Sequence, residues 1–301
     1  MIWILSLFSV LTIIAIKLYS KSIIANFPAL IKSDKVSVSI ASGCGGVLWD
    51  IFCLEALYLY FYQGIEKNFL IALFLPSLMF TFFGWLDDLL EFSPKPKLFY
   101  QIVLAICSLS IFIYLEKVSI SFVSFIFLII LLVWLVNSIN FVDILDGLAS
   151  GIVLLILCTF LIIFKIRALP PLFMTTVFLL FPLTIFFLHN VHRPTVYLGD
   201  AGAHLLGSLL FFLALKFYFL TSVKITASFS LLAIFSFLIF DFLYVCFIRW
   251  HNSKSLFMKS NDHQMFFILE KTGSKKMTLF IMLTMQLCSS ILALLLINWT
   301  R

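Results

Sequence analysis

Long apolar runs recur along the whole chain, and short polar segments separate them. A helix needs roughly 20 mostly apolar residues to cross a bilayer. The runs lack the period-two polarity of membrane β-strands, and helices satisfy their own backbone hydrogen bonds in lipid. Ten spans are predicted, at 2–18, 46–62, 69–85, 98–115, 121–137, 147–164, 172–189, 203–220, 226–248 and 278–298. The pattern therefore predicts an all-α, polytopic integral membrane protein with a single domain over residues 1–301.

Composition excludes several other classes of protein. Of the 301 residues, 63% are hydrophobic and only 11% are charged, whereas soluble domains average about 25% charged residues. The mean hydropathy is +1.17. Polar residues are too few to coat a water-facing globule, so we exclude a soluble enzyme, a nucleic-acid-binding module and a disordered chain. The net charge of +6 is better interpreted as a sign of membrane topology.

Basic residues predict how the chain is oriented. No Lys or Arg precedes the first run, and Lys17 and Lys21 follow it, which favours a retained helix with its N-terminus outside. Ten spans then place both termini outside. In this arrangement 13 of the 20 Lys and Arg residues lie on the inside, in agreement with the excess of positive charge usual in cytoplasmic loops.

Most acidic residues fall on the same predicted side. Nine of the 14 carboxylates lie in or beside the inside loops: Asp34, Asp87, Asp88, Glu91, Asp143, Asp146, Asp200, Asp262 and Glu270. The orientation was derived from Lys and Arg alone, so this gathering is an independent observation. The gathering of acidic residues indicates that the carboxylates have a function in binding or catalysis on the inside.

The first acidic cluster is the pair Asp87 and Asp88, at the inner end of the third span. Adjacent carboxylates repel each other unless a divalent cation or a basic group lies between them. Lys97 and Gln101 follow four residues apart, so they share one face at the start of the fourth span. The alternative, a solvated helix cap followed by an ordinary proline turn, stays open.

The second cluster joins two spans. Asn137, Asn140, Asp143 and Asp146 recur every three residues, which on a helix gives a broad polar face. The stretch 137–148 contains no Lys or Arg. Amide and carboxyl groups without a basic partner suit a bound ligand or metal, although a polar helix end with a glycine cap is the alternative.

The third cluster is a single Asp between glycines at the start of a span. Asp200 lies between Gly199 and Gly202, and glycines let a backbone approach a phosphate or a metal closely. The alternative is an ordinary N-cap Asp. We interpret His204, one turn later, as a hydrogen-bonded structural residue.

The longest inside loop, 249–276, contains six basic residues together with Asp262, His263 and Glu270. This charge suits an anionic substrate or lipid headgroups, and a topology signal is an equally good interpretation of most of its lysines. Asp241 precedes Arg249 by about two helical turns. Because a charge at a helix centre is costly in lipid, we expect Asp241 to face the bundle interior.

Taken in order, these motifs resemble a known family. The DD pair with Lys97 and Gln101, the NxxNxxDxxDGL run and the GDxG element look like those of the polyprenyl-phosphate N-acetylhexosamine-1-phosphate transferases of glycosyltransferase family 4. The chain is similar to the enzymes that transfer GlcNAc-1-phosphate from UDP-GlcNAc to undecaprenyl phosphate. The resemblance covers nearly the whole chain, including the ten-span layout with the N-terminus outside.

The resemblance implies a membrane-embedded enzyme with two anionic substrates. A polyprenyl phosphate, usually undecaprenyl phosphate in bacteria, attacks the β-phosphorus of a UDP-N-acetylhexosamine and releases UMP. The product begins a cell-surface polysaccharide such as an O-antigen, a capsule or a wall polymer. The implied cofactor is Mg²⁺, with Mn²⁺ as a substitute. The implied location is the bacterial inner membrane with the active site on its cytoplasmic face, and a homodimer is left open.

The resemblance also implies roles for individual residues. Asp200 matches the metal ligand, and the implied catalytic residues are Asp87, Asp88 and Asp143, with Asp87 deprotonating or orienting the lipid phosphate. The implied substrate-binding residues are Lys97, Asn137, Asn140, Asp146, Asn190 and His263. Of these, Lys97 would neutralise a phosphate and Asp146 would lie near the nucleoside.

Two segments depart from the family pattern. The first inside loop keeps its glycines at 43–46 but lacks the prolines and the Arg that usually precede them. The last inside loop keeps one histidine, His263, one position away from the expected place, and Gln264, Phe266 and Phe267 stand where other histidines are expected. Two alternatives therefore stay open: a non-catalytic relative that binds a nucleotide sugar or a lipid-linked sugar, and a substrate of the phospho-N-acetylmuramoyl-pentapeptide transferase type.

Overall fold

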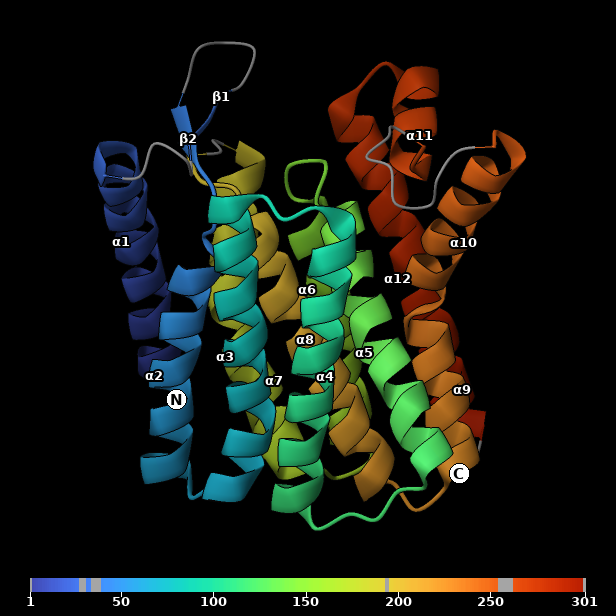
Figure 1. The fold of residues 1–301 in the computed structure, drawn as a ribbon. Coiled ribbons are helices and arrows are strands. Elements are labelled where there is room, and N and C mark those ends of the chain that lie inside the picture. The colour runs from blue at the N-terminus through green and yellow to red at the C-terminus, as the bar shows by residue number, and fades with distance from the viewer. Residues whose placement is uncertain (1, 27–30, 34–38, 193–194, 254–261, 300–301) are drawn as a thin grey trace.

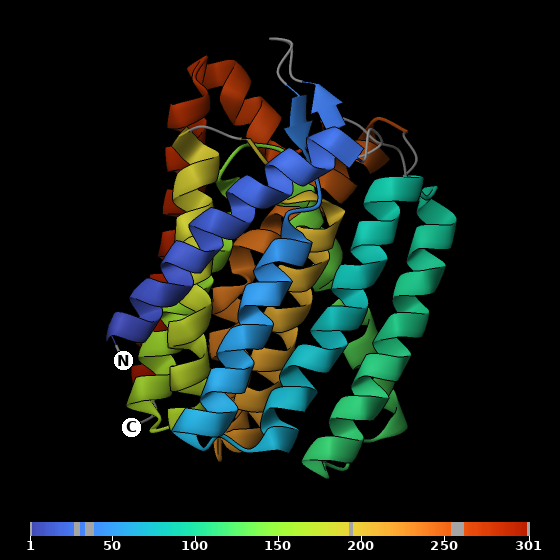
Figure 2. The same ribbon diagram turned by 90° about the vertical axis from the view of Figure 1, so that its left-hand side faces the viewer.

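A computed structural model describes residues 2–26, 31–33, 39–192, 195–253 and 262–299 as a bundle of helices (Figures 1 and 2). The helices are α1 (Ile2–Asn26), α2 (Gly45–Gln63), α3 (Lys67–Leu90), α4 (Pro94–Glu116), α5 (Phe122–Val142), α6 (Leu148–Ile166), α7 (Pro170–His192), α8 (Gly199–Leu220), α9 (Lys224–Ile234), α10 (Ser236–His251), α11 (Gln264–Thr272) and α12 (Lys275–Trp299). Strand β1 (Ile31–Ser33) pairs antiparallel with β2 (Ser39–Ala41). We call the end that bears this hairpin and α11 the hairpin end; both termini lie at the far end (Figure 1).

The helices agree closely with the apolar runs. Eight described helices are long and apolar enough to cross a membrane, and the pair α9–α10, bent by 57°, brings the number to nine. Helix α2, which includes Asp50, Glu55 and three tyrosines, is not among them although it packs in the bundle. The chain is therefore a multi-pass helical membrane protein, while the number ten remains a prediction. The hairpin is a small departure from the predicted all-α class.

Helix α8 forms the centre of the bundle (Figure 1). Of its 22 residues, 18 are buried, and it packs against α3, α5 and α2. Near its far end the buried Lys216 ammonium lies 2.5 Å from Glu116 Oε1 of α4 and 3.9 Å from the centre of the Phe69 ring. A buried charge in an apolar bundle needs such partners, so α8 is joined to α4 by an ion pair at this end.

Three glycines let backbones touch near the hairpin end, and we call Gly45, Gly84 and Gly202 the glycine junction. A Cβ added at Gly45 would lie 2.2 Å from the backbone N of Gly202, and one at Gly84 would lie 2.5 Å from the carbonyl oxygen of Asp200. Helices α2 and α3 thus meet α8 without a side chain between them. Gly202 therefore serves helix packing. The expectation that the glycines near Asp200 admit a phosphate or a metal stays a prediction.

The glycine junction predicts a contrast between two neighbouring substitutions. Gly45→Ala should destabilise the protein by about 1–3 kcal/mol, because the added methyl overpacks against backbone atoms that cannot rotate away. Gly46→Ala is the matched control, since nothing lies within 4 Å of a Cβ at Gly46. Melting temperatures of the two purified variants in detergent test this prediction. Equal values for Gly45→Ala and Gly46→Ala would contradict it.

Candidate functional site

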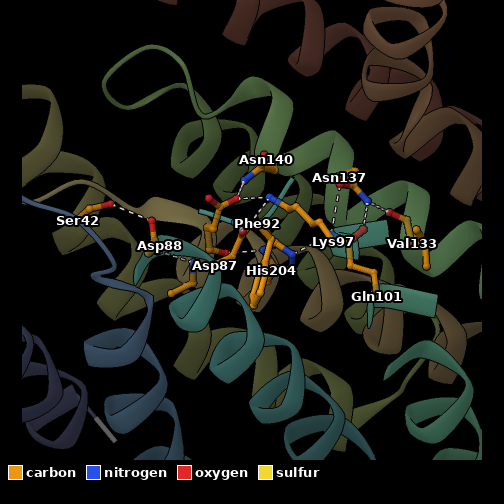
Figure 3. Close-up of polar contacts among 12 residues, drawn as sticks. Ser42, Asp87, Asp88, Phe92, Lys97, Gln101, Val133, Asn137, Asn140 and His204 are labelled. Carbon is orange, nitrogen blue, oxygen red and sulfur yellow. Dashed lines mark hydrogen bonds and ion pairs between the residues drawn. The ribbon is translucent and has the colours of Figure 1, made fainter. Parts of the chain in front are cut away.

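The site centres on the Lys97 ammonium, which lies between two carboxylates (Figure 3). Its Nζ is 2.6 Å from Asp87 Oδ2 and 2.7 Å from Asp200 Oδ1. Asn140 of α5 also donates from its side-chain amide to Asp200 Oδ1. Pro94 opens α4 at its first helical position, where a missing N–H does no harm, and this puts Lys97 in the first turn. Residues from α3, α4, α5 and α8 therefore meet at one point near the hairpin end.

The adjacent carboxylates of the DD pair turn to different partners. Besides Lys97, Asp87 accepts a hydrogen bond at Oδ1 from the backbone N–H of Phe92 at 2.9 Å. Asp88 accepts one from Ser42 Oγ at 3.1 Å and one from the backbone N–H of Ala201 at 3.0 Å. The basic group predicted for this cluster is present, but it bridges Asp87 to Asp200 rather than Asp87 to Asp88. Asp88 instead connects α3 to the start of α8.

The first loop approaches the same point through Ser42. Gly199 has a φ of +69°, and a Cβ there would lie 2.6 Å from Asp88 Oδ2, so only glycine fits beside this carboxylate. The carbonyl of Ser42 accepts a hydrogen bond from the Tyr19 hydroxyl at 2.8 Å. Burial raises the pKa of the neighbouring Cys44 thiol to about 12. Ser42 went unnoticed in the sequence because nothing local indicates a partner 46 residues away.

The NxxNxxDxxD run does not form one continuous polar face. Helix α5 extends to Val142 and ends there, with Asp143 as the residue that follows it. The backbone N–H of Asp143 donates to the Asn140 carbonyl at 3.3 Å, and Asp146 lies in the turn before α6. The expected broad helical face is therefore wrong, since the last two members lie in a turn. The roles of Asp143 in catalysis and of Asp146 near a nucleoside remain predictions.

Two predicted substrate-binding amides make hydrogen bonds within the protein. Asn137 donates to Gln101 Oε1 at 2.7 Å across the α4–α5 interface. Asn190 accepts from the backbone N–H of Gly147 at 2.6 Å and donates to the Val196 carbonyl at 3.2 Å. Asn190 thus connects the α5–α6 turn to the segment before α8. The roles of both amides in substrate binding remain predictions.

His263 lies at the start of α11 and is buried against α10 and α5. Its Nδ1 is 3.6 Å from Asp241 Oδ2, and its ring packs edge-on against Phe141, which follows Asn140. Arg249 Nε lies 3.7 Å from Asp262 Oδ2 in the same region. The expectation that Asp241 faces the bundle interior is confirmed, because its side chain is buried. His263 thus contacts the residue next to Asn140. Its side chain is not part of the cluster formed by Asp87, Lys97, Asn140 and Asp200.

The donor set around Lys97 also suits a hard divalent cation. Asp87 and Asp200 each place an oxygen on one shared cation, the ammonium. Within the described ranges, no group of three His, Cys, Asp or Glu side chains forms a metal cage. Mg²⁺ typically binds one or two carboxylates and completes its shell with waters and substrate phosphates. The residues therefore fit such an ion at Asp200 and Asp87.

Comparison with known families agrees with the motifs. Residues 70–218, about half of the chain, match the sequence profile described as glycosyl transferase family 4. The chain belongs to glycosyl transferase family 4. The matched segment includes Asp87, Lys97, Asn140 and Asp200, whereas His263 lies outside it. Family 4 enzymes use a polyprenyl phosphate and a nucleotide sugar, so membership supports a sugar-phosphate transferase of this general class. No curated protein matches the chain.

Removing the bridging ammonium should expose the two carboxylates to each other. We expect Lys97→Met to destabilise the protein by about 3 kcal/mol, because Asp87 and Asp200 lose the ammonium that lies between them. The control is Lys95→Met, since Lys95 is exposed in the same helical turn. Added Mg²⁺ should raise the melting temperature of Lys97→Met more than that of Lys95→Met. Equal stability and equal response to Mg²⁺ would show that Lys97 does not hold the carboxylates together.

Proposed function

We propose that the protein transfers an N-acetylhexosamine 1-phosphate from a UDP-sugar to undecaprenyl phosphate and releases UMP. In this reaction an oxygen of the lipid phosphate attacks the β-phosphorus of the UDP-sugar. The bond from that phosphorus to the bridging oxygen of the diphosphate breaks, and the electron pair leaves with UMP. The observation that carries the proposal is the convergence of Asp87, Lys97, Asn140 and Asp200 on one point.

Phosphoryl transfer depends mainly on positioning and charge neutralisation, and the site contains groups for both. The Lys97 ammonium lies within 2.7 Å of both carboxylates, and it would neutralise an incoming phosphate. The Asn140 amide holds Asp200 and would line the diphosphate. Contacts with Asp200 across the helix interfaces hold both groups, so they would be largely organised before a substrate binds.

The DD pair divides into two roles under this proposal. Both oxygens of Asp88 accept hydrogen bonds from Ser42 and Ala201, which favours a positioning role for Asp88. Asp87 directs one oxygen toward Lys97, where the lipid phosphate would arrive. We therefore assign to Asp87 the task of orienting that phosphate or taking its proton.

A magnesium ion would be held by Asp200 and Asp87, and Mn²⁺ is an alternative with the same ligand preference. Bound there, the ion would polarise phosphoryl oxygens and neutralise the negative charge that develops on them. The residues around it would then orient the two anionic substrates and hold Lys97 against their phosphates.

The proposed location is a bacterial inner membrane with the hairpin end facing the cytoplasm. Lys and Arg counts favour this orientation. A polyprenyl phosphate has its phosphate at headgroup level, while a nucleotide sugar arrives from water. The site lies near one end of the bundle, because Lys97 and Asp200 belong to the first turns of α4 and α8 (Figure 1). The product would begin a cell-surface polysaccharide such as an O-antigen, a capsule or a wall polymer.

Replacing Asp200 should abolish the reaction. We expect Asp200→Ala to release no UMP from UDP-sugars in the presence of undecaprenyl phosphate and Mg²⁺, because Lys97 and Asn140 lose their common partner. Asp50→Ala is the matched control, an exposed carboxylate on α2 outside the cluster. Release of UMP is measured with purified protein in membranes and a panel of UDP-sugars. Full activity in Asp200→Ala would disprove the proposed role of this cluster.

The same panel separates the proposal from a second candidate, a relative that binds its ligand without turnover. The glutamine and phenylalanines at 264–267, where the family has histidines, favour this candidate. Measurable UDP-sugar binding by the native protein, with no UMP released from any sugar, would support it. Including UDP-N-acetylmuramoyl-pentapeptide in the panel tests the remaining alternative for the substrate.

A further inference from the structure

A second layer of polar contacts lies one helical turn below the Lys97–Asp200 ion pair. Gln101 follows Lys97 by four residues on α4, and His204 follows Asp200 by four residues on α8. Gln101 Nε2 lies 2.9 Å from His204 Nε2, and both side chains are buried. Near the hairpin end, helices α4 and α8 are thus connected twice, first by an ion pair and then by an amide–imidazole contact (Figure 3). We call these two contacts the α4–α8 ladder.

The hydrogen bonds of the ladder have a defined direction. His204 Nδ1 lies 2.6 Å from the backbone carbonyl oxygen of Asp200, and a carbonyl oxygen only accepts, so Nδ1 carries the proton. Gln101 Oε1 accepts from Asn137 Nδ2 at 2.7 Å, which turns the NH₂ of Gln101 toward His204. The Gln101 amide therefore donates to His204 Nε2, and the imidazole is the Nδ1–H tautomer.

The donors and acceptors of the ladder satisfy one another. Asn137 donates to Gln101 and to the Val133 carbonyl, and its Oδ1 accepts from Gln101 Nε2 at 3.3 Å. Each nitrogen of the His204 ring already has a partner. The polar atoms of Gln101 and His204 are therefore engaged in hydrogen bonds within the protein. Their position favours a role exerted through Lys97 and Asp200.

The His204 ring also touches the helix that carries the DD pair. Phe80 stacks on it with ring centres 6.4 Å apart, and Phe83 packs edge-on at 5.7 Å, both from α3. His204 itself has no exposed surface. Its imidazole is therefore in contact with residues of α3, α4 and α8, which supply Asp87, Lys97 and Asp200 respectively.

We propose that His204 is a positioning residue that fixes Lys97 relative to Asp200 through Gln101. The proposal rests on the proposed function, because it assigns the ladder a task in the transfer reaction. An imidazole at this position reaches both the backbone of Asp200 and the side chain one turn below Lys97. Leu at 204 would fill similar space but make neither hydrogen bond.

Kinetics of His204→Leu test the proposal. We expect kcat for UMP release to fall about 10- to 100-fold, the loss usual for residues that orient a site through other groups, with the KM for the UDP-sugar little changed. Gln101→Leu should cause a similar loss, and the double variant should lose little more than either single one because the two side chains act together. Wild-type kcat in His204→Leu, or additive losses in the double variant, would overturn the proposal.

The control for general damage to α8 is Ser208→Ala. Ser208 is buried one turn further along the helix, and its hydroxyl donates to two carbonyls of its own helix, those of His204 at 2.7 Å and Leu205 at 3.0 Å. We expect Ser208→Ala to keep near wild-type kcat. An equal loss of kcat in Ser208→Ala and His204→Leu would mean that α8 tolerates no change there, which would overturn the specific role of His204.

The tautomer provides a readout that does not depend on turnover. Nitrogen-15 NMR of protein labelled at its five histidines, with His204→Asn to assign the signal, should show His204 protonated at Nδ1. In Gln101→Leu the Nε2 resonance of His204 should shift, since that nitrogen loses its donor. An Nε2–H tautomer would overturn the proposal even where the wild type turns over substrate. An Nδ1–H tautomer without turnover would instead place the failure in the proposed function.

Discussion

The Lys97 ammonium between Asp87 and Asp200 is the contact on which the rest of the site depends. Ionised groups inside an apolar bundle persist only when they are paired and hydrogen-bonded. Here a single positive charge serves two carboxylates from helices far apart in the sequence, so α3, α4 and α8 must keep their relative positions.

This contact requires backbones to approach more closely than side chains normally allow. The glycine junction brings α2 and α3 directly against α8, and Gly199 leaves room for the Asp88 carboxylate. Asp88 then accepts from the first turn of α8, where N–H groups have no partner within the helix. The N-terminus of α8 thus binds an anion, as helix N-termini commonly do, and the anion here is one of the protein's own carboxylates.

Sequence patterns predicted the helical membrane class, because it follows from local composition. The resemblance to the family implied that Asp87, Asn140 and Asp200 belong to one site, and the structure brings them together. The shared face of Lys97 and Gln101 also followed from helical periodicity. Ser42 and the backbone N–H of Ala201 were not predicted as partners of Asp88, since such contacts depend on how helices pack. The NxxNxxDxxD run was misinterpreted as one helical face because α5 ends at Val142, which periodicity does not reveal. His204 was expected to be hydrogen-bonded, but its partner Gln101 lies 103 residues away.

Two ion pairs join α4 to α8, Lys97–Asp200 at the hairpin end and Glu116–Lys216 near the far end, and together they fix how the two helices lie along each other. Helices α4 and α8 run in the same direction, so their macrodipoles are parallel and repel. In α8 the charges are placed favourably. Asp200 lies near the positive end of the helix dipole, and Lys216 lies toward the negative end. Lys97 and Glu116 have the reverse, unfavourable placement on α4. Each unfavourable charge of α4 faces a favourable charge of α8, so a slide of one helix along the other would separate both pairs at once.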